Sequence, residues 1–310
     1  MIYDFKYLKL SKSNFNNFLL IKNKFCSPYG WYTENMLNHE LNLYKEFSFQ
    51  EIYLIVKNGQ YIGYYEISSP YWASSMDVID STIVLPENNE NIDIYQNIID
   101  KQVQYAVNNN YSTLRAWDFS GSKFKRKFYE SNNFSIGLEE IESILHLEHV
   151  SFSSHGDIKI KTLNELKGID DNYKQKLFTL WSTVTDDVPK DLTGIINTNK
   201  LLEKTIFTKW FNDNHTFIAI DDNKWIGLIS YMDSEINSEM IITNLSGVLK
   251  KYRNKGICTY LKNHSLDILK KKNFKKIITW TEKDNSILSL NKKLGFAQSS
   301  KERSFLLKIS

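Results

Sequence analysis

The chain has 310 residues, of which 42% are hydrophobic, 14% aromatic and 24% charged. This composition can fill large cores, which excludes a wholly disordered chain, and the length is that of about two ordinary domains. The 39 basic and 36 acidic residues leave a formal net charge of only +3, which excludes a strongly basic nucleic-acid binder. No apolar run approaches the ~18 residues of a transmembrane helix, and residues 1–10 lack the pattern of a signal peptide. We therefore expect a cytoplasmic protein without a membrane partner.

The cysteines and histidines argue against two further classes, a disulfide-stabilised scaffold and a zinc protein. The two cysteines, Cys26 and Cys258, are far apart in sequence, which argues against a disulfide framework and is typical of a reducing compartment. The six histidines show no zinc-like spacing with cysteine. We therefore expect no bound metal.

The sequence repeats itself once. The segment KNGQYIGYYEI at 57–67 resembles DNKWIGLISY at 222–231, and each is typical of a β-hairpin. Further landmarks recur in the same order at an offset of 162–164 residues: Gly63 with Gly227, Trp117 with Trp280, and Phe134 with Phe296. We interpret the chain as a duplication, with one domain at 1–150 and a second at 151–310.

Each copy has the same coarse order of elements. In the second copy the hydrophobic periodicity predicts, in chain order, a strand at 158–163, helices at 173–184 and 199–212, strands at 215–220, 224–232 and 239–248, a helix at 255–272, a strand at 275–281, a helix at 285–293 and C-terminal strands through 303–309. Strands that precede a strand–helix–strand–helix core predict the α/β class, with a mixed antiparallel and parallel sheet flanked by helices in each domain.

The segment LSGVLKKYRNKGICTY at 245–260 carries the most chemical information. An apolar strand leads through a short turn into a long helix, and Gly256 stands where the helix begins. The first N–H groups of a helix have no intrahelical acceptor and, with the positive end of the helix dipole, favour anionic oxygen. Glycine lets a phosphate approach the backbone closely. Four basic side chains surround this turn: Lys250, Lys251, Arg253 and Lys255. The pattern predicts a pyrophosphate site that is neither a Walker loop nor a dinucleotide fingerprint.

This segment resembles the signature of the GNAT superfamily of N-acetyltransferases. The family pattern Q/R-x-x-G-x-G/A stands here as RNKGIC at 253–258, with Cys258 in place of Gly or Ala. KKIITWT at 275–281 occupies the place of the family's fifth strand, and NSILSLNKKLGF at 285–296 resembles its N…N..LGF ending. The resemblance is detailed in the second copy and extends in outline to the first. The whole chain resembles tandem GNAT proteins of the mycothiol synthase-like kind, with two GNAT-like domains.

The resemblance implies an acetyl-CoA-dependent N-acetyltransferase with its chemistry in the second domain, where a substrate amine attacks the thioester directly. Backbone amides of the turn would hold the pyrophosphate, and the pantetheine arm would lie along the strand that ends at residues 246–248. The coenzyme-binding residues that it implies are Ser246, Gly247, Val248, Arg253, Asn254, Lys255, Gly256, Ile257, Cys258, Thr259, Asn285 and Asn291. Asn285 also stands where a helix N-cap would.

The resemblance leaves the proton-transfer groups open. Many family members place a tyrosine where this chain has Asn291, so the usual general acid is missing. Three residues are candidates for acid, base or amine-binding group: Tyr252, Glu239 and Asp187. Each also has a simpler interpretation, as a packing residue for the tyrosine and as a solvated carboxylate for the other two. Cys258 is not proposed as a nucleophile.

The first copy lacks the basic turn. The equivalent segment is VLPENNENIDI at 84–94, where Asn89 stands in place of Arg253 and Ile92 in place of Gly256. Glu87 and Glu90 would repel a pyrophosphate. The sequence therefore predicts a degenerate GNAT-like domain that does not bind coenzyme in the usual way.

The acceptor is expected to be an amine, on a small molecule in preference to a protein. One alternative is an acyl-CoA-binding sensor or partner protein without turnover. Another is aminoacyl transfer from tRNA, as in the related two-domain peptidoglycan-bridge enzymes, which the low net charge and the intact basic turn disfavour. We expect no nucleic-acid partner, and a monomer or homodimer.

Overall fold

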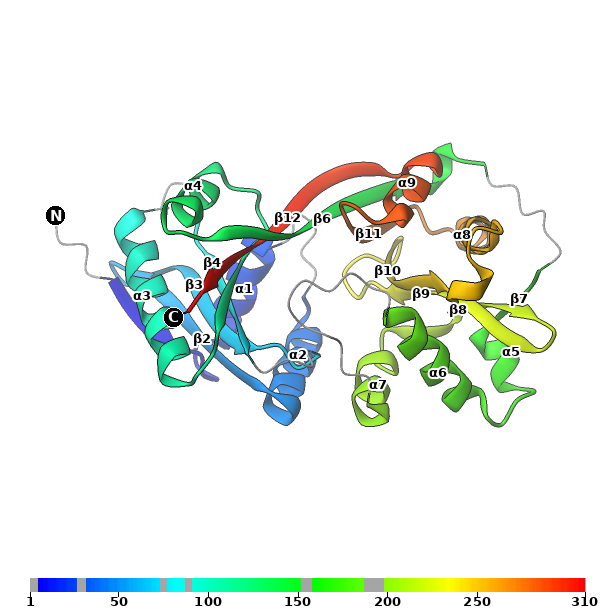
Figure 1. Cartoon of the computed structure of the whole chain (residues 1–310), viewed down its shortest axis with the longest axis horizontal. Helices are drawn as coiled ribbons and strands as arrows, with labels where there is room; N and C mark the ends of the chain where they lie inside the picture. The colour runs from blue at the N-terminus through cyan, green and yellow to red at the C-terminus, as the bar shows by residue number, and fades with distance from the viewer. Residues whose placement is uncertain are drawn as a thin grey trace. The chain divides into compact units, whose positions relative to one another are not determined.

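The computed structural model describes residues 5–26, 32–72, 77–86, 91–151, 158–186 and 198–309, which form two compact units. The first unit holds the described residues up to Glu140 together with residues 300–309, and the second holds those between 141 and 299. Each unit is a mixed sheet of antiparallel and parallel strands flanked by helices (Figure 1), which confirms the predicted α/β class.

The first unit begins with an antiparallel meander and ends with parallel pairing. Its elements are β1 (Phe5–Lys9), α1 (Phe15–Cys26), α2 (Glu34–Phe47), β2 (Phe49–Lys57), β3 (Gln60–Ser69), β4 (Val78–Val84), α3 (Ile92–Asn108), β5 (Thr113–Asp118), α4 (Lys123–Ser131) and the first half of β6 (Ser135–His146). β1 to β4 are antiparallel neighbours, whereas β4 and β5 run parallel. The C-terminal strand β12 (Ala297–Lys308) pairs antiparallel with β5.

The second unit has the same order around its own sheet. Its elements are η2 (Leu147–His149), β7 (Lys159–Thr162), α5 (Leu163–Lys167), α6 (Tyr173–Thr185), α7 (Asn199–Ile206), β8 (Phe211–Asp221), β9 (Lys224–Asp233), β10 (Met240–Val248), η3 (Lys250–Tyr252), α8 (Ile257–Lys271), β11 (Lys276–Glu282) and α9 (Ser286–Lys293). β7 to β10 are antiparallel neighbours, and β10 and β11 run parallel.

The two hairpins of the repeat are confirmed. Asn58 and Gly59 join β2 to β3, and both have a positive φ, of 51° and 78°. Asp222 and Asn223 join β8 to β9 with φ values of 45° and 62°. Two successive residues with positive φ are the mark of a type I′ turn, whose twist matches that of the flanking strands. Asn, Asp and Gly tolerate this conformation, which explains how the sequence specifies both turns.

Helices cover both faces of each sheet. In the first unit α3 and α4 pack on one face through residues such as Tyr95 and Phe128, and α1 and α2 pack on the other through Phe18 and Leu37. In the second unit α8 covers one face, and α5, α6 and α7 cover the other. Burial of these apolar side chains is the main stabilising term of each unit.

The predicted helix at 199–212 is too long. α7 ends at Ile206, and β8 already begins at Phe211, opposite Met232 of β9. The polar side chains that follow find partners on β9, because Asn212 Nδ2 donates to Asp233 Oδ2 at 2.8 Å and His215 Nδ1 lies 2.6 Å from Asp233 Oδ1. These long-range bonds extend the strand at the expense of the helix.

The units exchange strands along the sequence, so the chain divides differently from a single cut at residue 150. β6 passes from the first unit to the second after Glu140, and β12 passes from the second to the first after Ser299. Residues Arg303–Lys308 of β12 pair with Asp118–Thr113 of β5, so the C-terminus completes the first unit's sheet. That the first unit is a degenerate copy of the second stays a prediction.

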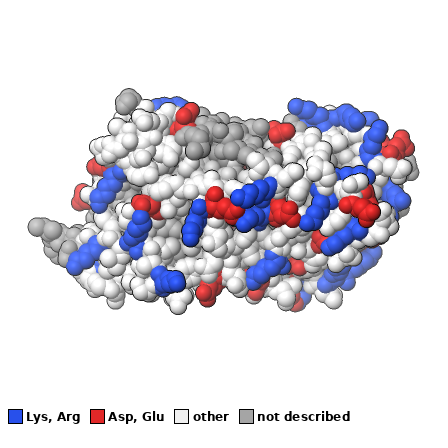
Figure 2. Space-filling model, turned by 90° about the horizontal axis from the view of Figure 1, so that it is seen from below, with Lys and Arg blue, Asp and Glu red and all other residues white. Residues whose placement is uncertain are grey.

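Surface features of the described residues agree with the low net charge. Over the face drawn in Figure 2, basic and acidic side chains are interspersed without a large field of one sign. No helix within the described ranges is long and apolar enough to cross a membrane.

Because β12 passes from the second unit to the first, we predict that Phe296 and Phe305, which are nine positions apart, stabilise different units. Phe305 is fully buried in the core of the first unit, where its ring stacks on Tyr129 at 4.9 Å, and Phe296 belongs to the core of the second unit. Each Phe→Ala substitution leaves a cavity that should cost about 3–5 kcal/mol. Hydrogen exchange should show loss of amide protection in β4 and β5 for Phe305→Ala, and in β10 and α8 for Phe296→Ala. Loss of protection in both units for either variant would contradict this assignment.

Candidate functional site

The second unit's sheet opens where its two parallel strands part. β10 and β11 pair only through Met240–Ile242 with Lys276–Ile278, and the described residues show no pairing between them beyond that point. The register of β10 on β9 shifts between Thr243 and Leu245, which marks a β-bulge. A bulge bends its strand and increases the local twist, so it turns the end of β10 away from β11. Backbone groups on this side of residues 243–248 are left without a strand partner.

The turn after β10 places an uncapped helix start beside this opening. Gly256 is the N-cap of α8 and has a φ of 76°, and no heavy atom lies within 4 Å of the position that a Cβ would occupy. It offers no side chain to cap the helix. The first amides of α8 therefore have no intrahelical acceptor and sit at the positive end of a helix of 15 residues. The sequence predicts an anion site at this helix start, and the structure places free amides there.

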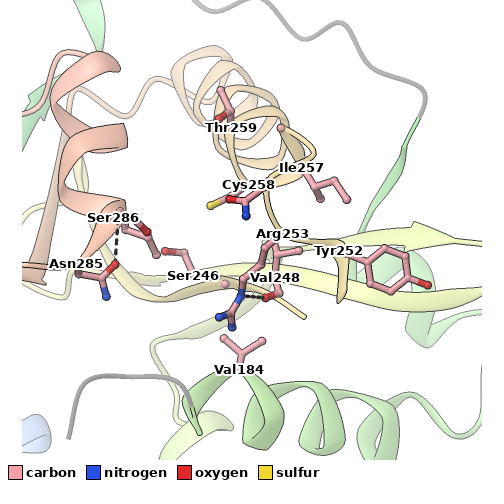
Figure 3. A pocket seen from close by; sticks show the side chains of 14 residues that line it. Val184, Ser246, Val248, Tyr252, Arg253, Ile257, Cys258, Thr259, Asn285 and Ser286 are labelled. Carbon is pink, nitrogen blue, oxygen red and sulfur yellow. Dashed lines mark hydrogen bonds between the residues drawn. The ribbon is translucent and has the colours of Figure 1, made fainter. Parts of the chain in front are cut away.

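A pocket of about 310 Å³ joins the strand end to the helix start (Figure 3). Ten of the predicted coenzyme residues line it: Ser246, Gly247, Val248, Arg253, Asn254, Gly256, Ile257, Cys258, Thr259 and Asn285. Four other residues complete the lining: Val184, Tyr252, Ser286 and Ile287. None of these lining residues is a carboxylate, so the pocket combines positive potential with neutral polar groups.

Two contacts hold the pocket's floor in place. Arg253 Nε donates to the carbonyl oxygen of Val248 at 3.0 Å, which ties the turn to the end of β10 (Figure 3). Gly247 allows α6 to approach β10, because a Cβ there would lie 2.2 Å from Val184 Cγ1. This contact explains why Val184 lines the pocket. The sequence signals it only indirectly, through a glycine within a strand.

Two coenzyme candidates do not reach the pocket as predicted. Asn291 is fully buried, its Nδ2 donates to Thr281 Oγ1 at 3.2 Å, and it does not line the pocket. Lys255 is exposed at the mouth, where its Nζ lies 5.7 Å from the centre of the Tyr252 ring. Lys255 therefore adds positive charge near the mouth without lining the pocket.

Asn285 both caps α9 and lines the pocket. Its Oδ1 accepts from the Ile287 amide at 2.9 Å, which leaves Nδ2 available as a donor. The two interpretations of Asn285 are therefore compatible. Ser286 and Ile287 line the pocket because they form the first turn of the helix that Asn285 caps, and the capping pattern was the signal that could have identified them.

The three candidate catalytic residues have different outcomes. Glu239 precedes the first residue of β10, about 30 Å along the strand from Val248, and its exposed carboxylate pairs with Lys275 at 2.5 Å. The structure therefore does not bring Glu239 to the pocket. Asp187 lies outside the described residues. Tyr252 lines the pocket, but its ring points away from Cys258 and Asn285 (Figure 3).

Cys258 takes the small-residue position of the signature and points into the pocket (Figure 3). Burial raises the pKa of its thiol, and the nearby ammonium of Lys262 opposes this effect. The thiol is therefore protonated near neutral pH. This agrees with the expectation that Cys258 is not a nucleophile.

The corresponding helix of the first unit, α3, begins differently in the described residues. The N-cap of α3 is Asn91, whose side chain accepts from the Asp93 amide at 2.7 Å. The first turn of α3 is thus capped by its own sequence and carries a carboxylate. Three residues expected to repel or replace a phosphate contact, Glu87, Asn89 and Glu90, lie outside the described residues.

Known proteins resemble this chain in sequence over its second half. A family model described as the acetyltransferase (GNAT) family matches residues 182–296. N-alpha-acetyltransferase 30 of Schizosaccharomyces pombe is 29% identical over 86 residues, which are 27% of this chain and 57% of that protein. The match therefore spans little more than half the length of this relative.

Solved structures resemble the chain over nearly its whole length. A GCN5-related N-acetyltransferase from Sphaerobacter thermophilus has a TM-score of 0.72 at 9% identity, covering 98% of this chain and 96% of that one. A tandem GNAT protein from the clavulanic acid biosynthesis pathway has a TM-score of 0.70 at 11% identity and covers 99% of both chains. Likeness at such low identity concerns the fold alone. Residues 182–296 thus match the acetyltransferase (GNAT) family, in a chain with the fold of tandem GNAT proteins.

Proposed function

We propose that the protein is an acetyl-CoA-dependent N-acetyltransferase that binds its donor substrate in the pocket of the second unit. The observation that carries this proposal is the adjacency of two features. An uncapped helix start opened by Gly256 suits a diphosphate, and the parting of β10 from β11 suits an extended arm with amide groups. One pocket lined by both features matches one ligand that carries both groups.

The chain's own groups have distinct tasks in this proposal. The first amides of α8 and the surrounding lysines hold the diphosphate, and the edge of β10 at residues 246–248 that faces away from β9, together with Asn285 Nδ2, holds the arm. Attack by the acceptor nitrogen forms the amide bond and breaks the thioester C–S bond, and the amine's proton balances the thiolate that leaves. Asn291 cannot supply the hydroxyl that many family members place there, so positioning carries most of the rate enhancement.

The acceptor is proposed to be a primary amine on a small molecule. None of the described residues that line the donor pocket is a carboxylate, so in this proposal other parts of the chain recognise the amine. The name of the curated relative, an N-alpha-acetyltransferase, makes a peptide α-amine the second class of acceptor to test. In this proposal the first unit does not bind the donor, because the helix start that α3 offers is capped and acidic.

The donor site can be tested by substituting glutamate for Gly256. The carboxylate would lie where the phosphates bind, and repulsion together with lost space should weaken acetyl-CoA binding about 100-fold or more. Gly59 is a matched control, because it has a φ of 78° and equally open surroundings but lies in the first unit. Calorimetry should show one site per chain in the wild type and in Gly59→Glu, and none in Gly256→Glu.

Alanine at the same two positions separates backbone strain from charge. A non-glycine residue in this conformation costs about 1–2 kcal/mol at either position, so Gly256→Ala and Gly59→Ala should lose similar stability. Gly256→Ala should still bind acetyl-CoA more tightly than Gly256→Glu. Equal loss of binding in Gly256→Glu and Gly59→Glu, or two sites in the wild type, would contradict the assignment.

Turnover can be tested by following thiol release from acetyl-CoA with a panel of small primary amines and short peptides. We expect amine-dependent release by the wild type and by Gly59→Glu, and about 100-fold less by Gly256→Glu at subsaturating donor. Release only with peptides would move the acceptor to the second class. Tight donor binding without release above hydrolysis for any amine would favour the sensor alternative.

A further inference from the structure

One buried cation of the second unit lies next to the donor pocket without lining it. Lys262 of α8 is only 2% exposed, although lysine is almost never fully buried unless it is paired. It follows Cys258 by one helical turn, and side chains four residues apart on a helix are neighbours. Because the Cys258 thiol points into the donor pocket (Figure 3), Lys262 lies one turn deeper than the lining of that pocket.

The charge of Lys262 is not matched by a carboxylate among the described residues. The ring of Phe296 lies beside it, with its centre 5.9 Å from Nζ. Burial lowers the pKa of Lys262, and the Cys258 thiol opposes this effect. The hydroxyl of Tyr231, on the neighbouring strand β9, is hydrogen-bonded to Ser265 Oγ at 2.8 Å. A buried charge of this kind is costly unless a group of opposite charge reaches it.

The same backbone bond follows α4 in the first unit and α9 in the second. The Phe134 amide donates to the carbonyl oxygen of Tyr129, and the Phe296 amide donates to that of Asn291, each at 3.0 Å. Tyr129 therefore corresponds to Asn291. In the first unit the Tyr129 ring is fully buried, with its centre 5.0 Å from that of the Phe134 ring. The side chain of Asn291 is too short to fill the volume of such a ring beside Phe296.

Lys262 takes the place of an isoleucine of the first unit. α3 and α8 end with the same turn, in which the carbonyl oxygens of Ala106 and Leu269, 163 positions apart, each accept from an amide five residues later. The same offset relates Lys262 to Ile99, which is 2% exposed in the core of the first unit. The first unit thus combines a short apolar side chain with a tyrosine, and the second combines a long cationic side chain with Asn291. Since cores are closely packed, the long side chain compensates for the short one.

An acceptor at this place also has no partner. Asn291 Oδ1 is buried and accepts no hydrogen bond from a described residue, whereas Nδ2 donates to Thr281 Oγ1 at 3.2 Å. Thr281 belongs to β11, the strand that parts from β10. The ring of Phe296 faces Lys262, and its amide binds Asn291. An unmatched cation and an orphaned acceptor therefore flank Phe296, next to the strand at which the sheet opens.

The course of α8 places Lys262 beside the arm of the proposed donor. α8 connects the end of β10 to the start of the parallel strand β11, so it runs back over the sheet. Lys262 is six residues after Gly256, which is about 9 Å along the helix axis. The same distance along β10 is two to three residues, which leads from Val248 back to about Ser246. Lys262 is therefore level with the strand residues that hold the arm in the proposed function.

We propose that Lys262 is a catalytic residue whose ammonium stabilises and protonates the sulfur of the leaving coenzyme. This inference rests on the proposed function. When the acceptor nitrogen forms the amide bond and the thioester C–S bond breaks, the sulfur keeps the electron pair and takes a proton from the Lys262 ammonium. The neutral Lys262 amine regains the proton that the acceptor nitrogen releases, so no proton is gained or lost. The developing thiolate supplies the negative charge that Lys262 lacks in the free protein.

The charge interaction can be measured with CoA and with desulfo-CoA, in which hydrogen replaces the thiol group. A free thiol is mostly protonated at neutral pH, and a cation within a few ångströms lowers its pKa. Ultraviolet difference spectra should therefore show a thiolate band when CoA binds to the wild type, and none in Lys262→Met, which keeps the chain length without the charge. By calorimetry, the preference for CoA over desulfo-CoA should be about tenfold smaller in Lys262→Met than in the wild type.

Turnover should respond in kcat and not in donor binding. Lys262→Met should lower kcat about 100-fold, the usual effect of losing one proton donor, and change the affinity for desulfo-CoA by less than about twofold. Lys271→Met is the matched control, because Lys271 belongs to the same helix but is exposed and pairs with Asp267 at 2.6 Å. Its thiolate band and kcat should equal those of the wild type. Removal of an unpaired buried charge should not destabilise the fold, and Lys262→Leu is a second variant with the same expected results.

Three results would overturn the inference while the donor site stands. The first is a wild type that binds CoA without a thiolate band. The second is the same preference for CoA over desulfo-CoA in the wild type and in Lys262→Met. The third is an equal loss of affinity for both compounds in Lys262→Met, which would mean that Lys262 holds the arm instead of acting on the sulfur. A wild type that binds neither acetyl-CoA nor desulfo-CoA would overturn the proposed function, and the inference with it.

Discussion

The parting of β10 from β11 is the constraint on which the rest of the second unit depends. Backbone N–H and C=O groups need partners, and a strand that stops pairing inside a sheet leaves a line of them unsatisfied. Here the line begins on β10 after Ile242, where pairing with β11 stops, and leads to an uncapped helix start, where the amides of α8 add to it. The sheet's other neighbours hold β10 in this position, because β9 pairs with it through Val248. In the proposed function, the donor substrate forms the hydrogen bonds that these backbone groups do not form within the protein.

The two units have the same order of elements, yet they treat the corresponding helix start in opposite ways. Asn91 caps α3 with its own side chain and Asp93 adds a negative charge, so this helix needs no external anion. Gly256 gives α8 neither cap nor charge. The contrast is local and involves few residues, so two units with the same order of elements differ at this one helix start.

Features that depend on neighbours in sequence could be predicted, and features that depend on long-range pairing could not. The hairpin turns, the helix start at Gly256 and the cap at Asn285 follow from local backbone preferences, and all are found. The passage of β12 into the first unit is a choice of strand partner, which no local pattern encodes. Glu239 was misplaced for a related reason. It directly precedes β10, but the two ends of this strand lie far apart and have different surroundings.

The buried polar side chains of β3, β4 and β5, among them Glu66, Asp80 and Arg115, show how strongly a fold depends on strand register. A shift of one residue between β2, β3 and β4 would move Glu66 and Asp80 to the face that packs against α3. No apolar alternation marks these positions in the sequence, because the strands that carry them are buried on both faces. Strand register therefore decides which helices these carboxylates face, and no local pattern in the sequence encodes it.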